Sequence, residues 1–314
     1  MNHKLIKKIS LHFYVLALFV FLYGCANENS KKTGLIAEIN PNEIFWYVLD
    51  VSDQGNQADA NLLIFGSGEV VLIDAGQTSN LLAPRLKQLG VSHVDKILVS
   101  HAHVDHYGGI LGLIDSGVSV GTVYLKTPPR NICDLEVPWG CNYSDLLTLK
   151  DLLRVHSITI SESKAGDVYI NNDLFSLKTL YAHDGSSPPV GNTDVNDMSV
   201  ILSLSAGSTK ALFTGDLNDK FGSYLASSGD PDLKAQLLKV PHHGTDALAP
   251  NSFFEWVGPK AAFVPAPLSL WLSDRSARAR TWFLEQKIPT FITGESGMIK
   301  ITISSDGYEI TPAS

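Results

Sequence analysis

Residues 96–106 (KILVSHAHVDH) join a short, mostly apolar run directly to three histidines and an aspartate. Such a run is typical of a buried strand, so the cluster is expected at the C-terminal end of a strand. Alternate side chains of an extended segment share a face, which allows His101 and His103 to converge on one ion. The turn that follows can aim Asp105 and His106 at a second ion. Imidazole and carboxylate ligands suit zinc or a similar first-row metal, so the fold has to bring further ligands to this strand end.

The rest of the chain alternates strand-like and helix-like segments joined by short turns. Two strands are expected in 61–76 around a Gly-Ser-Gly turn, and a hairpin in 198–216. Leucines at helical spacing predict a helix over 144–156, with Ser144 as its N-cap. Other expected elements are a helix over 81–90, strands within 166–181 and over 236–240, a helix over 276–287 and a terminal hairpin over 290–303. No linker interrupts 45–310, so we expect one domain with helices on its outer faces.

The N-terminus has the pattern of an export signal. Three lysines precede the apolar run 9–22, which is shorter than the ~18 to 20 residues of a membrane span. The run ends in Leu22-Tyr23-Gly24-Cys25, which resembles a bacterial lipobox with Cys25 as the lipidated residue. An ordinary signal peptide or a membrane anchor is the alternative. We therefore expect an extracytoplasmic protein of the cell envelope, anchored to the membrane by lipid, with a signal peptide over 1–24, a tether over 25–44 and a hydrolase domain over 45–314.

Cysteine use and charge agree with export. Cys133 and Cys141 remain as an even pair in a compartment where disulfides persist, and we expect them to bond, with two free buried thiols as the alternative. Removal of residues 1–24 takes away three lysines and no acidic residue, which leaves 21 basic and 32 acidic side chains and a formal net charge of −11. This balance argues against strong, non-specific nucleic-acid binding, although it does not exclude a local basic patch.

Four motifs in a fixed order carry a family resemblance. They are Asp74, His101-x-His103-x-Asp105-His106, Gly215-Asp216 and His242-His243-Gly244. The set resembles the metallo-β-lactamase superfamily. The segment NDMSVILSLSAGSTKALFTGDL, followed by LLKVPHHG, is most similar to the branch found in ComEC-type competence proteins and in phosphodiesterases such as phosphorylcholine esterase. The resemblance covers about 45–310 and implies an α/β fold, a four-layered αββα sandwich with metals on loops at one edge of its two sheets.

The resemblance also implies a ligand set. His101 and His103 would bind a first metal, and Asp105 and His106 a second. Asp216 would bridge both metals, because a carboxylate has two oxygens. At least one of His242 and His243 should be a ligand. Adjacent residues at a strand end diverge, so the other should contact a ligand or the substrate, and we favour His242 as the ligand.

Three further positions are less constrained. Asp74 would orient the histidine loop rather than bind metal, although an Asx-turn at the following Ala75-Gly76 predicts the same location. His183 follows a strand where many superfamily members carry a metal ligand, but the competence branch often lacks it, so ligand and structural roles both stay open. The His-Pro that this branch often has after the next strand is missing, and Asp274 is the available substitute. The loop 127–143 lies where this fold tends to insert segments that gate the substrate.

Hydrolysis is the chemistry that this set implies. Two cations ~3.5 to 4 Å apart lower the pKa of a shared water and hold developing charge, and a phosphodiester suits that geometry best. We expect two zinc ions per chain, with Mn²⁺ or Fe²⁺ as alternatives, catalytic roles for Asp105 and Asp216, and a small-molecule or cell-envelope phosphoester as substrate. One alternative is a hydrolase of β-lactams or of other esters and amides. Another is a surface lipoprotein without catalysis that binds a ligand or assists DNA uptake.

Overall fold

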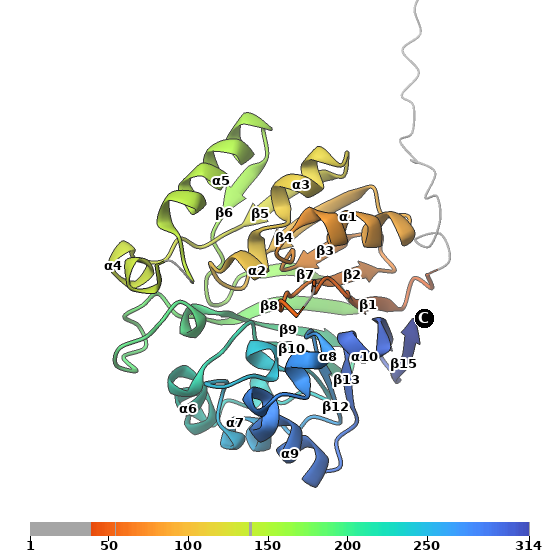
Figure 1. Ribbon diagram of the computed structural model, residues 1–314. Helices are drawn as coiled ribbons and strands as arrows, with labels where there is room; N and C mark the ends of the chain where they lie inside the picture. Colours follow the sequence, from red (N-terminus) through yellow and green to blue (C-terminus); the bar gives the residue numbers. More distant parts are fainter. Residues whose placement is uncertain (1–38, 54, 138–139, 314) are drawn as a thin grey trace, which may run out of the picture. The chain divides into compact units, whose positions relative to one another are not determined.

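The computed structural model describes residues 39–53, 55–137 and 140–313 (Figure 1). The chain divides into two units, Met1–Lys32 and Thr33–Ser314, and the second contains every described residue. The expected signal peptide and lipidated Cys25 lie outside the described residues, as does the tether up to residue 38. Within the described ranges, no helix has the length and apolar character needed to cross a membrane.

The first of two mixed sheets has eight strands. Strands β3 to β6 run parallel to one another, and the remaining neighbours pair antiparallel. The strand order is β15 (Gly307–Ala313), β14 (Met298–Ser304), β1 (Ile44–Val48), β2 (Asn61–Phe65), β3 (Val70–Ile73), β4 (His93–Leu98), β5 (Ser119–Tyr124) and β6 (Thr159–Ser161).

The second sheet has seven strands, of which β10 to β13 are parallel. The strand order is β13 (Thr290–Ile292), β12 (Ala261–Val264), β11 (Leu237–Lys239), β10 (Thr209–Phe213), β9 (Val200–Ala206), β8 (Phe175–Ala182) and β7 (Val168–Asn171). Parallel neighbours end at the same edge of a sheet. The loops after β3 and β4 therefore lie together, and so do the loops after β10 and β11.

Three hydrophobic cores define four layers. The middle core packs one sheet against the other, and the fully buried Trp46 of β1 lies there with its ring 4.8 Å from that of Phe213 and 4.7 Å from that of Phe263. The other two cores join each sheet to its own helices. A sheet that is apolar on both faces must be covered on both, and this arrangement does so. The expected αββα sandwich is confirmed.

The helices lie on the outer faces of the two sheets (Figure 1). The first sheet is covered by α1 (Ser79–Gln88), α3 (Ile110–Asp115) and α5 (Tyr143–Val155), and the second by α6 (Asp219–Ser228), α7 (Asn251–Val257) and α9 (Ala277–Glu285). Short helices α2 (Val104–Tyr107), α4 (Arg130–Cys133), α8 (Leu268–Trp271) and α10 (Thr293–Ser296) lie in connections between strands or longer helices.

Two local predictions were wrong. The N-cap of α5 is Asn142 rather than Ser144, because the Asn142 side chain accepts hydrogen bonds from the backbone amides of Ser144 and Asp145. Residues 290–303 do not form a hairpin. The segment Thr293–Ser296 makes a helical turn that carries the chain from β13 in one sheet to β14 in the other, and β14 pairs with β15 instead.

Candidate metal centre

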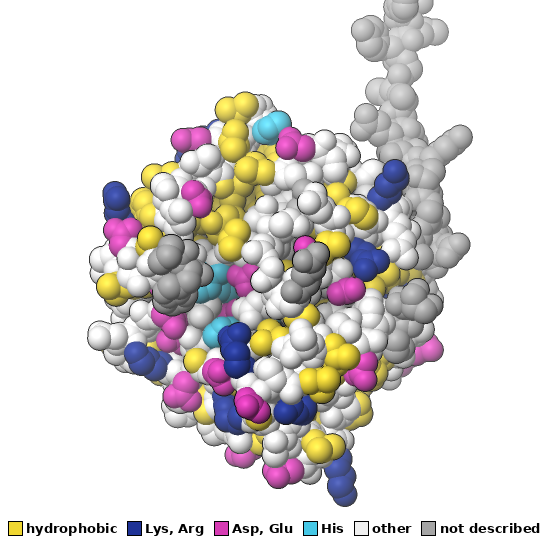
Figure 2. All heavy atoms as spheres, viewed as in Figure 1, with side chains coloured by type: hydrophobic (Ala, Val, Ile, Leu, Met, Phe, Trp, Pro, Cys, Tyr) yellow, Lys and Arg dark blue, Asp and Glu magenta, His cyan; other side chains and the backbone are white. Residues whose placement is uncertain are grey.

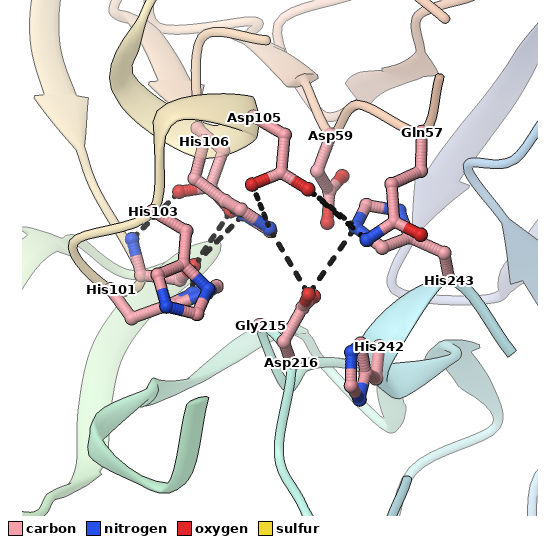
Figure 3. Close-up of polar contacts among 12 residues, drawn as sticks. Gln57, Asp59, His101, His103, Asp105, His106, Gly215, Asp216, His242 and His243 are labelled. Atoms are coloured by element: carbon pink, nitrogen blue, oxygen red, sulfur yellow. Dashed lines mark hydrogen bonds and ion pairs between the residues drawn. The ribbon is translucent and has the colours of Figure 1, made fainter. Parts of the chain in front are cut away.

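The candidate site lies where the loops after β3, β4, β10 and β11 meet at one edge of the two sheets (Figure 3). Gly215, after β10, has a φ of +50°, and a Cβ there would lie 2.9 Å from the Cβ of Ser100 and 2.8 Å from that of Ser199. Glycine is the residue that adopts this conformation without strain and leaves room for the two loops to touch. The glycine therefore lets Asp216 approach the histidine loop.

Four ligand side chains converge in this contact zone. One ligand atom each of Asp105, His106, Asp216 and His243 lies within 4.8 Å of the others. The Asp216 Oδ2 atom is 3.3 Å from the Nε2 atoms of both His106 and His243. His243 Nε2 is also 3.4 Å from Asp105 Oδ2. Two nitrogens and two carboxylates are a ligand set that zinc prefers.

Hydrogen bonds outside the cluster orient both imidazoles. His106 Nδ1 donates to Asp74 Oδ2 at 2.9 Å, and His243 Nδ1 donates to the carbonyl of Pro265 at 2.8 Å. Each ring therefore points Nε2 inward, and these two nitrogens are buried without a hydrogen-bond partner. Buried polar atoms are normally paired, and a cation held among these atoms would satisfy them. The residues present fit a metal ion, which we call the second position.

The charges in this cluster are strongly coupled. Burial lowers the pKa of His106 and of His243. The facing carboxylates, above all that of Asp216, raise both pKa values by more than burial lowers them. The pKa of His106 therefore lies well above its ordinary value, and that of His243 rises to about 9. Burial raises the pKa of Asp216, but His243 and His106 pull it well below its usual range. In the absence of metal the imidazoles are therefore protonated, and metal binding must release their protons.

His101 and His103 face each other beside this cluster. Ser100 Oγ donates to Asp74 Oδ2 at 2.8 Å and so accepts from His101 Nδ1 at 3.1 Å. His103 Nε2 donates to Glu136 Oε2 at 2.6 Å. These bonds leave His101 Nε2 and His103 Nδ1 as two lone pairs that face each other at 3.1 Å. A cation to one side of the line that joins them could bind both nitrogens at about 2.0 to 2.1 Å, and we call this the first position.

The final histidine pair differs from our expectation. His243, not His242, enters the ligand cluster, so the preference for His242 was wrong (Figure 3). Both residues have left-handed backbone conformations, with φ of +50° at His242 and +51° at His243, which an extended strand end does not provide. His242 turns away, and its Nδ1 bonds Asn218 Oδ1 at 2.8 Å. Burial lowers the pKa of His242, so this ring is neutral at pH 7.

His183 is not among the side chains that the structure brings together. Its Nε2 bonds the carbonyl of Pro188 at 2.8 Å, and its Nδ1 accepts from the amide of Gly185 at 2.9 Å. Both ring nitrogens are thus used within the loop that follows β8. Of the two roles left open for His183, these contacts favour the structural one. Asp274 is exposed and does not replace the missing His-Pro, whereas its neighbour Arg275 lines the site cavity.

Sequence reasoning missed a buried cation next to Asp216. Lys239, the last residue of β11, is 1% exposed and forms an ion pair with Asp59, which is 0% exposed. Its ammonium also lies 3.6 Å from Asp216 Oδ1 and donates to the carbonyl of Gly215 at 2.7 Å. Burial lowers the Lys239 pKa, but Asp59 and Asp216 raise it above its ordinary value. Oδ1 of Asp216 is buried without a hydrogen-bond partner, so the expected bridging role of Asp216 stays a prediction.

The sequence LLKV did not predict the ion pair of Lys239 with Asp59, because a single lysine among apolar residues is as typical of an exposed strand edge as of a buried charge. Gln57 and Glu136 were missed for the same reason, since each meets the site only through the tertiary fold. Gln57 donates to Asp105 Oδ2 at 3.2 Å, and Glu136 accepts from His103.

Cys133 and Cys141 form the expected disulfide, with 5.0 Å between their Cα atoms, and Glu136 lies between them in sequence.

A cavity of about 410 Å³ opens over the ligand cluster. Its lining includes Asp105, Asp216 and His103 of the expected ligand set, together with His242, Asn218 and Arg275. Figure 2 shows histidine and acidic side chains at the centre of this face, with hydrophobic side chains above them and basic side chains below. The size suits a small ligand or one end of a larger one.

Two stacked mixed sheets, outer helices and a buried His/Asp cluster at the sheet edge define the metallo-β-lactamase fold. The family model described as the metallo-beta-lactamase superfamily matches residues 55–126, which include the histidine motif. The crystal structure of the metallo-beta-lactamase fold protein YhfI from Bacillus subtilis superposes with a TM-score of 0.52 at 13% identity, covering 86% of this chain and 100% of YhfI. Fold and family model together support this superfamily for the chain.

The curated relatives are much longer than this chain. ComE operon protein 3 of Bacillus subtilis is 27% identical over 204 residues, which are 64% of this chain and 22% of that protein. Endoribonuclease YSH1 of Candida glabrata is 25% identical over 195 residues, which are 55% of this chain and 23% of that protein. The chain thus spans less than a quarter of the length of either relative. The low-identity match to a competence protein fits the ComEC-like branch.

Proposed function

We propose that the chain is a metal-dependent phosphodiesterase, exported and held at the cell envelope by a lipid on Cys25. The observation that carries the proposal is the convergence of two imidazole nitrogens that lack hydrogen-bond partners with two carboxylates, beside a second histidine pair; His106, His243 and Asp216 are buried, and Asp105 is partly exposed. A structural zinc needs four ligands and no open position, whereas this larger set opens onto a cavity.

The roles of the residues follow from their contacts. His101 and His103 would hold one metal at the first position. Asp105, His106 and His243 would hold another at the second, and Asp216 would be a ligand that the two positions share. Bound ions would supply Lewis acidity toward the ester and make water nucleophilic at neutral pH. Asp74 would keep His106 in the required tautomer, because its carboxylate accepts the Nδ1 proton.

The cavity supports a small phosphoester over a long polyanion. Among the described residues that line it, Arg275 supplies the only Lys or Arg side chain, against four carboxylates, those of Asp105, Asp194, Asp216 and Asp246. The Arg275 guanidinium lies 3.6 Å from exposed Asp246 and is free enough to turn to a phosphate oxygen. His242 and Asn218, which also line the cavity, would contact the leaving group. The endoribonuclease among the relatives acts on phosphodiesters, as its name states, which supports the same bond class.

Hydrolysis of three chromogenic substrates tests the proposal. We expect the full chain with Zn²⁺ or Mn²⁺ to cleave bis(p-nitrophenyl) phosphate in preference to p-nitrophenyl phosphate and to a chromogenic β-lactam. His103→Ala and Asp216→Ala should each lower kcat/KM by at least ~100-fold, because each removes a ligand worth several kcal/mol to the transition state. His156→Ala is the matched control, since His156 is exposed at the end of α5. Preferred cleavage of the β-lactam would reject the phosphodiesterase assignment. Absence of turnover with metal bound would support a binding protein.

The lipid anchor needs a separate test. Expression of the full chain in a bacterial host with radiolabelled fatty acid should label the protein and place it in the membrane fraction. Cys25→Ser should lose both the label and the membrane association, while the folded unit stays intact because it begins beyond this residue. Equal labelling of the wild type and the variant would remove lipidation at Cys25 from the proposal.

A further inference from the structure

The segment between Cys133 and Cys141 carries one buried acid. Glu136 is 3% exposed, whereas its neighbours Leu135 and Val137 are 79% and 56% exposed. A carboxylate costs several kcal/mol to bury unless hydrogen bonds compensate it. The chain therefore directs a charged side chain inward and two apolar side chains outward, against the usual preference of both residue types. This inversion calls for a specific partner of the carboxylate.

The partners of Glu136 come from three separate segments. Its Oε2 atom accepts from His103 Nε2 at 2.6 Å and from the Cys141 backbone amide at 3.1 Å. Its Oε1 atom accepts from the Val195 amide at 2.9 Å. A Cβ at residue 140, which is glycine, would lie 2.6 Å from Glu136 Oε2, so the close approach requires glycine there. The carboxylate thus joins the disulfide segment to the histidine motif.

The bond to His103 determines which ring nitrogen can bind a metal. A carboxylate accepts hydrogen bonds, so His103 Nε2 carries the proton and Nδ1 has a free lone pair. That lone pair is directed at His101 Nε2, 3.1 Å away. Without Glu136 the ring would be free to place its proton on Nδ1 or to rotate, and either change removes a ligand from the first position.

We propose that Glu136 is a positioning residue for His103, held in place by the Cys133–Cys141 disulfide, and that it determines the metal affinity of the first position. Glu136 acts through His103 and is not itself a ligand. The disulfide contributes in two ways. It closes the segment on both sides of Glu136, and one of its cysteines donates a backbone hydrogen bond to the same carboxylate oxygen that His103 uses. The inference depends on the proposed function only for the presence of metal.

Metal competition against a chelator tests this role in the full chain. Glu136→Gln keeps the shape of the side chain but points its amide NH₂ at either the His103 or the Val195 donor. We expect one of two zinc ions to bind ~10- to 100-fold more weakly, the effect typical of losing a ligand's hydrogen-bond partner. The double variant Cys133→Ala, Cys141→Ala should weaken the same ion. Asp134→Asn is the matched control, because it removes an equal charge from an exposed position of the same segment and should leave both affinities unchanged.

The ¹⁵N shifts of the His103 ring give a readout that needs no metal. The metal-free wild type should show the Nε2–H tautomer, and Glu136→Gln should shift the population toward Nδ1–H. Unchanged tautomer and unchanged zinc affinities in Glu136→Gln would overturn the inference. If that variant fails to fold, Glu136→Asp, which shortens the side chain by one methylene, takes its place in both measurements. Two tight metal ions without phosphodiester cleavage would reject the proposed function and leave the role of Glu136 standing.

Discussion

Lys239 is expected to be the most sensitive single position for stability near the site. Lys239→Met removes an ammonium that is 1% exposed and leaves Asp59, at 0% exposed, without its ion-pair partner. Removing one partner of a buried ion pair typically costs ~3 to 5 kcal/mol, because the remaining charge stays desolvated. The Asp216 Oδ1 atom loses the same ammonium at 3.6 Å, which adds to the cost in metal-free protein. We expect a loss in the free energy of unfolding at the upper end of that range.

A double-mutant cycle separates charge from packing. In the wild type the side-chain amide of Asn61 donates to Asp59 Oδ1 at 2.8 Å. Asp59→Asn keeps the side-chain volume and an oxygen that accepts this hydrogen bond. Combined with Lys239→Met it removes both charges, so the double variant should be more stable than the sum of the single losses predicts, by ~1 to 3 kcal/mol. Urea unfolding of chelator-treated full chain, followed by circular dichroism, measures all four proteins. A loss below ~1 kcal/mol in Lys239→Met, or strictly additive losses, would refute the reasoning.

The pH dependence of this pair has a definite sign. The folded-state pKa of Lys239 lies above its ordinary value of 10.5. Its contribution to stability is therefore fully present below pH 10.5 and is lost as the pH rises through the folded-state pKa. The difference between wild type and Lys239→Met should be constant from pH 7 to pH 9 and should shrink only in strong alkali.

Four further substitutions have distinct expected outcomes. His243→Ala should weaken zinc binding at the second position by more than the ~10- to 100-fold typical of losing a hydrogen-bond partner, whereas His242→Ala should retain both ions and lose turnover; equal metal loss in both variants would contradict the assignment. Gly215→Ala should cost ~2 to 5 kcal/mol in urea unfolding, because the left-handed φ of +50° and two Cβ contacts of 2.8 and 2.9 Å both oppose a side chain. Burial, then a neighbouring aspartate, raises the pKa of Asp197 from 3.8 to about 6, so its charge opposes folding as the pH rises through that interval. Asp197→Asn should therefore stabilise the protein at pH 8 by up to ~3 kcal/mol and by less at pH 5, and an equal gain at both pH values would exclude the titration as its cause.

The histidine motif and its strand were predictable because their signals are local. The run 96–100 before His101 includes the second half of β4, and the imidazoles and carboxylate that follow it in sequence also meet in space. The Gly-Asp motif was recognisable for a similar reason, since Gly215 must adopt a left-handed turn after β10. The outer helices followed from the alternation of apolar strands with amphipathic helices. The four layers were implied by the resemblance to the metallo-β-lactamase superfamily.

The remaining features depend on contacts that no local pattern encodes. Whether His242 or His243 enters the cluster is set by two successive left-handed residues, a conformation that non-glycine residues rarely adopt. Glu136 and Lys239 are single charges whose partners lie 33 and 180 positions away, at His103 and Asp59. Residues 290–303 have the alternation of a hairpin, yet a helical turn separates the two strands: β13 is the edge strand of the second sheet, and β14 pairs with β1 and β15 in the first.

Metal stoichiometry tests the central claim most directly. The full chain, stripped with chelator, reloaded with Zn²⁺ and dialysed, should contain about two zinc ions per chain by elemental analysis, because the proposal assigns ligands to two positions. Asp216→Ala removes the carboxylate that both positions share and should retain at most about one. A wild type that retains less than one ion, or an Asp216→Ala variant that retains as much as the wild type, would contradict the two-metal site proposed for this chain.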